Sequence, residues 1–162
     1  MVTGAAVYVA LGTVANKQGR VAGINIGGGY ATFPGVVGTA VTKLCSLEIG
    51  RTGISEAEAE RAGYGFVSVK VDATTRAGYF PGSGPITVKL LAEKGRGRVL
   101  GAQIVGAEGA AKRIDVLATA ITAGMTVFDV IDLDLSYAPP FSSVWDPLQV
   151  SARQAARRLA EQ

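Results

Sequence analysis

One short aromatic and proline-rich segment, residues 134–147, is the part of this chain best suited to present a reactive side chain. It holds Tyr137, the only tryptophan (Trp145) and half of the six prolines. Pro139 and Pro140 fix their own φ angles and push the residue before each of them out of the helical region. We therefore expect Tyr137 on a rigid, extended backbone that can present it beyond its own domain. These residues predict how the backbone presents Tyr137, and they do not show which group its side chain would contact.

The usual catalytic and nucleotide-binding patterns are missing from the sequence. There is no histidine, which excludes Ser-His-Asp and Cys-His arrangements. There is no G-x-G-x-x-G motif and no Gly-Lys pair, so the sequence holds neither a dinucleotide-binding loop nor a Walker-type phosphate loop. With no histidine and one cysteine, no metal site with nitrogen or sulfur ligands is expected. The chain as it stands has no self-contained catalytic set.

The remaining candidates for chemistry have simpler structural interpretations. Cys45 lies in an apolar, β-rich run in which no neighbour would activate the thiol, so we expect a buried structural cysteine. Asp132 and Asp134 are interpreted as loop or capping residues. A single cysteine excludes an internal disulfide and suggests a reducing, cytoplasmic location.

Length and composition indicate one globular domain, or one domain with an appendage. The 162 residues, 48% of them hydrophobic, are enough for a buried core. The net charge of +3 is dispersed except for Arg153, Arg157 and Arg158, and no aromatic residues interleave with these three. We interpret them as a solvated helix face and expect no nucleic-acid partner. Residues 4–14 are apolar but lack a basic flank and are too short to span a bilayer, so no membrane anchor is expected.

The first 35 residues differ in character from the rest. Val7, Val9 and Leu11 alternate with other residues as in a buried strand, and residues 14–25 favour a short helix before the glycines at 27–29. These elements are too few to bury a core of their own. We interpret them as the tail of another domain, or as a strap that lies on one.

From residue 35 onward the pattern predicts a compact α+β domain. Strands are expected at 39–46, 47–52, 67–71, 86–92 and 99–106, and helices at 55–63, 108–124, from 126 and from 146. Ser55 with Glu58 forms a capping box, and Asp146 with Pro147 forms an N-cap and first-turn proline. The last two strands should form an antiparallel hairpin. The final helix carries an alanine-rich stripe, which predicts close packing within the domain or against a second subunit.

Four short stretches, in this order and at these spacings, carry a resemblance to a known family. They are residues 10–12 with 15–20, residues 38–41 running to 51–53, residues 100–103 with 112–115 (Lys-Arg-Ile-Asp), and residues 137–142 (Tyr-Ala-Pro-Pro-Phe-Ser). The chain resembles the C-terminal third of the FAD-dependent pyridine nucleotide-disulfide oxidoreductases. Glutathione- and lipoamide-type relatives carry a His-Glu pair here, so the missing histidine favours the branch of coenzyme A-disulfide reductases and NADH oxidases.

The resemblance implies a division of the chain into two parts. Residues 35–162 would be an α+β dimerisation domain, an antiparallel sheet packed with helices that joins two subunits head to tail. Residues 1–34 would be a remnant of the FAD-binding domain, with Leu11, Thr13 and Ala15 nearest the cofactor. The N-terminus of the helix at 15–20 would then approach the pyrimidine end of the flavin, where its dipole stabilises negative charge.

The resemblance also gives Tyr137 a target. In this branch, tyrosines of the dimerisation domain reach into the thiol site of the partner subunit; Tyr137 matches one of them, and Tyr79, beside Phe80-Pro81-Gly82, resembles the other. A phenol, with a usual pKa near ~10, can donate a hydrogen bond to a sulfur during redox exchange. The alternative is that both tyrosines only pack against the partner.

The parent enzyme implied by the resemblance is a homodimer that uses FAD and NAD(P)H. Its terminal acceptor, a coenzyme A disulfide, a persulfide or oxygen, stays open. The family's nucleotide-binding glycine motifs and its redox cysteine have no counterpart in this sequence, so we expect a piece of a longer protein that is inactive and without cofactor in isolation. The alternative is a free-standing interaction module that uses the same fold to pair with a separate flavoprotein chain.

Overall fold

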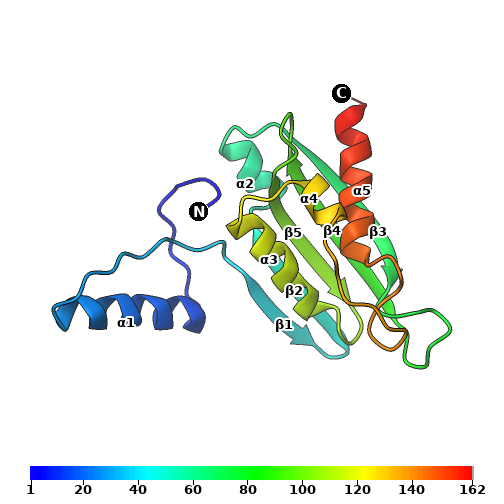
Figure 1. Ribbon diagram of the computed structural model, residues 1–162, viewed down its shortest axis with the longest axis horizontal. Helices are drawn as coiled ribbons and strands as arrows, with labels where there is room; N and C mark the ends of the chain where they lie inside the picture. The colour runs from blue at the N-terminus through cyan, green and yellow to red at the C-terminus, as the bar shows by residue number, and fades with distance from the viewer. Residues whose placement is uncertain (162) are drawn as a thin grey trace.

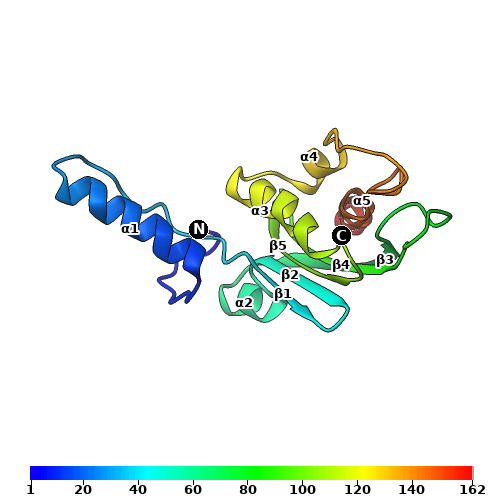
Figure 2. The same cartoon turned by 90° about the horizontal axis from the view of Figure 1, so that it is seen from below.

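The computed structural model describes residues 1–161 and is built around one antiparallel sheet (Figure 1). The strands are β1 (Ala40–Leu44), β2 (Leu47–Gly53), β3 (Phe66–Thr74), β4 (Pro85–Glu93) and β5 (Val99–Gly106), in the spatial order β1-β2-β5-β4-β3. The helices are α1 (Gly12–Ile26), α2 (Glu56–Arg61), α3 (Ile114–Thr122), α4 (Val127–Ile131) and α5 (Pro147–Ala160), with a 3-10 turn at Ala111–Arg113. Figure 2 shows α3, α4 and α5 on one face of the sheet and α2 on the other. The predicted α+β class is confirmed.

The sheet is a set of adjacent antiparallel pairs, and the predicted hairpin of β4 with β5 is confirmed. In that hairpin Lys89 pairs with Gln103, and the register shifts once, between Leu91 and Ala92. Both strands are buried along most of their length, since helices cover one face and the neighbouring strands cover their edges. These two strands therefore form the centre of the domain.

Local capping signals start α2 and α5 where the sequence predicts, whereas the helix expected from 108 begins with the 3-10 turn and continues as α3. The Ser55 hydroxyl accepts a hydrogen bond from the backbone N–H of Glu58, whose carboxylate accepts the Ser55 N–H in return. These bonds from Ser55, first its backbone N–H and then its hydroxyl, lower the pKa of Glu58. Asp146 accepts the N–H of Leu148 and so caps α5, whose first residue is Pro147.

The main core lies between the sheet and helices α3, α4 and α5. Its fully buried side chains include Leu90, Ile104 and Leu148. The alanine-rich stripe of α5 faces this core, because Ala152 and Ala155 are completely buried against it. The stripe therefore serves packing within the domain, and it gives no support to the alternative that α5 packs against a second subunit.

The N-terminal segment departs from the sequence prediction. Residues 2–11 form no strand, and Val7 is 69% exposed, so the prediction of a buried strand at Val7, Val9 and Leu11 is wrong. Alternation alone cannot make a strand, since its backbone groups need a neighbouring strand and none pairs with it here. The segment instead lies on the domain as a strap, where the Tyr64 hydroxyl donates to the carbonyl of Val2 at 2.8 Å.

The position of Cys45 also differs from the prediction. The structure places it, exposed, in the two-residue turn that joins β1 to β2, with a φ of 53°. Two-residue hairpin turns require positive φ, and glycine or asparagine usually marks them. The sequence Cys45-Ser46 lacks that mark, so the apolar residues around it predict a buried position where the structure has an exposed turn.

The exposure of Cys45 predicts rapid modification of its thiol. We expect Ellman's reagent to titrate one thiol in the native protein at a rate close to that in guanidinium chloride, because no side chain covers the sulfur. The matched control is Cys45→Ser, which should give no signal and unchanged stability. A thiol that reacts only after unfolding would contradict this placement.

Candidate functional site

The two predicted tyrosines lie on two neighbouring loops at one end of the sheet. Tyr79 belongs to the loop 75–84, between β3 and β4, and Tyr137 to the segment 132–146, between α4 and α5. The loops lie side by side in both ribbon views (Figures 1 and 2). They are joined directly, since the backbone N–H of Ala77 donates to the carbonyl of Pro139 at 3.2 Å. The structure therefore brings together residues that are 58 positions apart in sequence.

The phenol of Tyr137 lies close enough to Tyr79 to be influenced by it. Tyr137 is 47% exposed and Tyr79 is 79% exposed. Desolvation and then the neighbouring phenol of Tyr79 raise the pKa of Tyr137. The Tyr137 hydroxyl thus keeps its proton throughout the neutral range and stays a hydrogen-bond donor. Both side chains remain open to a group that approaches from outside the domain.

The segment 132–146 contains no helix or strand, its two adjacent prolines lie in a turn closed by the N–H of Phe141 on the carbonyl of Ala138, and α5 anchors it. At its start, the side-chain amide of Gln149 donates to the carbonyls of Ile131 and Leu133 at 3.0 and 2.8 Å. Near its end, the guanidinium of Arg153 stacks over the ring of Trp145, 4.5 Å from the ring centroid. These contacts hold Tyr137 on a backbone with little freedom to move.

Arg113 also belongs to this site, although no pattern in the sequence predicts it. Its side chain donates to backbone carbonyls of both tyrosine-bearing loops. The only signal was its place in the Lys-Arg-Ile-Asp stretch at 112–115. Nothing in the local pattern shows which carbonyls this side chain meets.

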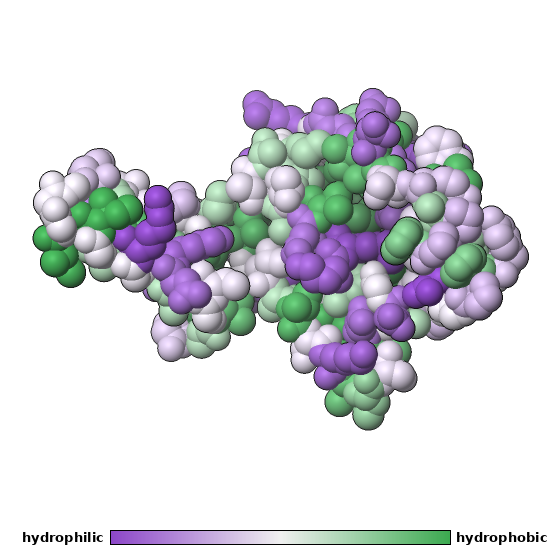
Figure 3. Space-filling model, turned by 60° about the horizontal axis from the view of Figure 1, so that its bottom comes forward, coloured by the Kyte–Doolittle hydropathy of each residue, from purple (hydrophilic) through white to green (hydrophobic). Residues whose placement is uncertain are grey.

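The predicted flavin-side residues gather at the other end of the molecule. Leu11 precedes α1 as its N-cap residue, and no side chain caps the helix there. Thr13 and Ala15 lie exposed in the first turn. In the ribbon views α1 projects away from the sheet on the side opposite the tyrosine loops (Figures 1 and 2). The space-filling view shows the same segment as a lobe joined to the main body by a narrow neck (Figure 3).

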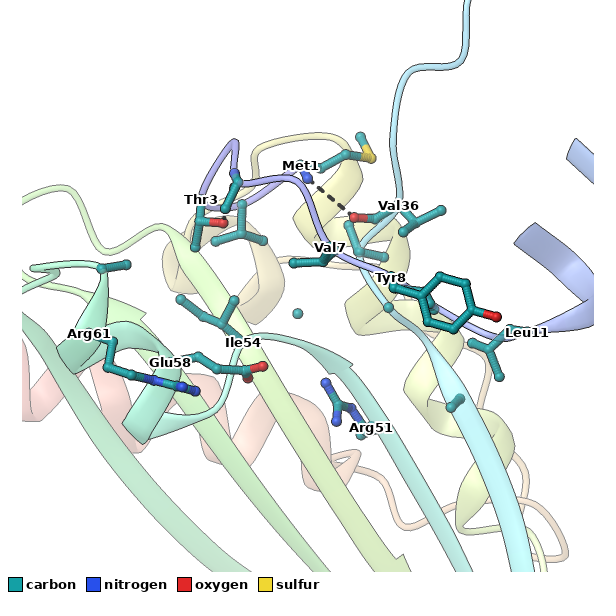
Figure 4. Close-up of a pocket in the computed structure, with 18 of the residues that line it drawn as sticks. Met1, Thr3, Val7, Tyr8, Leu11, Val36, Arg51, Ile54, Glu58 and Arg61 are labelled. Atoms are coloured by element: carbon teal, nitrogen blue, oxygen red, sulfur yellow. Dashed lines mark hydrogen bonds between the residues drawn. The ribbon is translucent and has the colours of Figure 1, made fainter. Parts of the chain in front are cut away.

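Two cavities surround the strap that leads to α1. The larger, about 890 Å³, lies between residues 1–11 and the start of the domain, and Leu11 lines it. Figure 4 shows Arg51, Glu58 and Arg61 extending toward it from β2 and α2, and Val7 reaching it from the strap. The smaller, about 390 Å³, is lined by both Leu11 and Thr13. The first turn of α1 is thus exposed beside the smaller cavity.

A single chain therefore does not bring the tyrosines and the flavin-side residues into one site. Tyr137 and Tyr79 lie on neighbouring loops, while Leu11, Thr13 and Ala15 lie at the start of α1, which projects from the opposite side of the sheet. A site that needs both groups must take them from two chains.

Most of the chain matches the model of one known protein family. The model of the family described as the pyridine nucleotide-disulphide oxidoreductase dimerisation domain matches residues 39–148. The chain belongs to this family. The match begins just before β1 and ends at the start of α5, so it covers the whole sheet and both tyrosine-bearing loops.

The relatives of this dimerisation domain carry the names of sulfur, persulfide and coenzyme A-disulfide reductases and of an NADH oxidase. It is 48% identical to the NAD(P)H sulfur oxidoreductase (CoA-dependent) of Pyrococcus furiosus over 94% of this chain and 34% of that protein. It resembles the solved structure of an NAD-dependent persulfide reductase from A. fulgidus with a TM-score of 0.96 and 46% identity, over 99% of this chain and 30% of that one. The reduced CoADR-RHD of Bacillus anthracis gives a TM-score of 0.92 and 39% identity, over 99% and 29%.

The dimerisation domain spans about a third of the length of the curated relatives it matches. Among the described residues, none of the helices is long and apolar enough to cross a membrane.

Proposed function

We propose that this domain joins two subunits of a flavin-dependent NAD(P)H oxidoreductase that reduces a disulfide or persulfide, and that it completes the partner's active site. The observation that supports this most is the separation of the tyrosine loops from α1 within one chain. A head-to-tail pair places the tyrosine loops of each chain beside the flavin of the other. The substrate is a coenzyme A disulfide or a coenzyme A persulfide, as the names of the relatives suggest.

In this proposal Tyr137 and Tyr79 act on sulfur. The neutral phenol of Tyr137 donates a hydrogen bond to a thiolate or persulfide sulfur of the partner's site, which stabilises the negative charge that forms as the S–S bond breaks. The raised pKa of Tyr137 supports this role, because the hydroxyl remains protonated at the pH at which thiolates form. Tyr79 lies next to it and orients or shares that bond.

The residues at α1 fit an edge contact with FAD. The uncapped first turn of α1 leaves backbone N–H groups free to donate to an acceptor atom, and Leu11, Thr13 and Ala15 surround it. FAD, when bound, accepts a hydride from NAD(P)H and passes the electrons on to the disulfide. Residues 1–34 would then be the end of an FAD-binding domain. This chain holds no dinucleotide-binding glycine loop, so we expect it to be colourless and to bind neither FAD nor NAD(P)H by itself.

The proposal predicts the oligomeric state. The purified chain should scatter light as a dimer at micromolar concentration, since a twofold homodimer is the commonest arrangement for such a surface. Only monomer in light scattering would count against the proposal. A monomer that instead captured a separately purified flavoprotein chain would favour the free-standing interaction module.

The proposal includes a cytoplasmic location, which fits a chain with one cysteine, and no nucleic-acid or membrane partner. Two of the three C-terminal arginines bind locally, since Arg153 stacks on Trp145 and Arg158 donates to the carbonyl of Ser68.

A further inference from the structure

The guanidinium of Arg113 joins four separate places in the fold. Arg113 lies at the end of the 3-10 turn, immediately before α3. Its nitrogen atoms donate to the carboxylate of Asp146 at 3.2 Å and to the carbonyls of Gly109, Thr75 and Phe141 at 2.9, 2.6 and 2.7 Å. Two of these carbonyls belong to the loops that carry Tyr79 and Tyr137.

Asp146 fixes the orientation of this guanidinium. Its Oδ2 atom accepts from Arg113 and, at 3.1 Å, from the hydroxyl of Ser142, while its Oδ1 atom accepts the N–H of Leu148 and caps α5. The side chains of Arg113 and Asp146 are each only 12% exposed. Helix α5 and the end of the tyrosine segment are therefore tied to the same charge pair.

The two loop carbonyls that Arg113 holds lie close in sequence to the two tyrosines, so fixing these carbonyls also restrains the phenols. Thr75 precedes Tyr79 by four residues, and Phe141 follows Tyr137 by four. One nitrogen atom, Nη2 of Arg113, donates to both carbonyls, so it sets the distance between the two loops. The planar fork of an arginine can hold several acceptors in one fixed geometry, which the single ammonium of a lysine cannot do.

We propose that Arg113, held by Asp146, is a positioning residue that keeps Tyr79 and Tyr137 side by side for their action on the partner's sulfur site. This inference rests on the proposed function and deepens it, because it names the group that assembles the tyrosine pair. Arg113 itself lies behind the loops, where it bonds to backbone carbonyls.

The first test is the replacement Arg113→Lys, which keeps the positive charge beside Asp146 and loses the fork. Tyrosine ring carbons labelled with ¹³C report titration by NMR in the chain as it stands, and Tyr137→Phe identifies the Tyr137 signal. We expect Arg113→Lys to return the raised pKa of Tyr137 toward its ordinary value, since the loops separate and the phenol is rehydrated. The matched control is Arg158→Lys, which loses a bond to the carbonyl of Ser68 on β3. An unchanged Tyr137 titration in a folded Arg113→Lys protein would overturn the proposal.

The second test is a double-mutant cycle in the full-length flavoenzyme that contains this chain. Arg113→Lys should lower kcat/KM for the disulfide or persulfide by about 10- to 100-fold, which is the usual effect of a displaced catalytic group. In a Tyr137→Phe background the same replacement should cause little further loss, because both changes remove one function. Losses that simply multiply would show that Arg113 does not act through Tyr137.

The outcomes separate this inference from the proposed function. If Tyr137→Phe keeps full turnover while Arg113→Lys shifts the Tyr137 titration, the catalytic role of the tyrosine fails and the positioning contact stands. If Tyr137→Phe is slow while Arg113→Lys changes neither turnover nor titration, the positioning role fails alone. Should Arg113→Lys not fold, Ser142→Ala loosens the same carboxylate, and an unchanged Tyr137 titration there would likewise overturn the proposal.

Discussion

Replacement of Asp146 by alanine is expected to lower the free energy of unfolding by about 3 to 5 kcal/mol. The change leaves the nearly buried guanidinium of Arg113 without its counter-ion, and it removes the N-cap of α5, which by itself contributes about 1 kcal/mol. Urea denaturation followed by circular dichroism measures this loss as a lower midpoint.

Two further variants separate the causes of that loss. Asp146→Asn keeps an N-cap acceptor and removes the charge, so it should retain part of the stability. Asp115→Ala is the matched control, because Asp115 forms an exposed ion pair with Lys112, and it should change stability by no more than about 1 kcal/mol. Equal losses of unfolding free energy for Asp146→Ala and Asp115→Ala would show that the Arg113–Asp146 pair contributes no more than an exposed ion pair.

Tyr137→Phe in the full-length enzyme is expected to slow turnover by about 10- to 100-fold. A hydrogen bond to a charged sulfur is worth about 1.5 to 3 kcal/mol, and phenylalanine removes it while keeping the ring. Steady-state oxidation of NAD(P)H with a coenzyme A disulfide or persulfide measures the loss. Light scattering should show an intact dimer. The control is Tyr30→Phe, which changes an exposed tyrosine in the link between α1 and β1. Unchanged turnover would reduce Tyr137 to a packing residue.

Mixed dimers decide whether Tyr137 acts across the subunit interface. One subunit carries Tyr137→Phe, and the other lacks the reactive cysteine of this family, so that neither homodimer is fully active. If Tyr137 serves the partner's site, the mixed dimer has one complete site and regains activity after subunit exchange. If Tyr137 serves its own chain, no site is complete and activity stays low.

The starts of α2, α4 and α5 show how far local sequence can determine structure. The Ser55-Glu58 box and the Asp146 cap appear as predicted, and Thr126 with Asp129 forms a second capping box. Each forms between residues two or three positions apart, so the chain closes it whatever the rest of the fold does. The alternation along β3 follows from a related cause, since one buried face imposes a period of two, and Val67, Val69 and Val71 are the residues it buries.

Other features could not be predicted from the sequence, because they depend on the tertiary structure around them. The strand predicted at Val7, Val9 and Leu11 does not form, because no neighbouring strand pairs with it. Cys45 is predicted to be buried, because its turn lacks the usual glycine or asparagine. The alanine stripe of α5 could pack within the domain or against a second subunit. Only the tertiary structure shows that it packs against the core of its own domain.

The sequence by itself determined the α+β class, the main elements of the domain and the resemblance that the family match confirms. The tertiary structure alone decided which loops meet. It placed Tyr79 beside Tyr137, and it joined both loops through Arg113, whose bonds reach residues 28 to 38 positions away. Contacts over such separations leave no periodicity in a sequence, because they arise only when the strands and helices have packed and fixed where each loop ends.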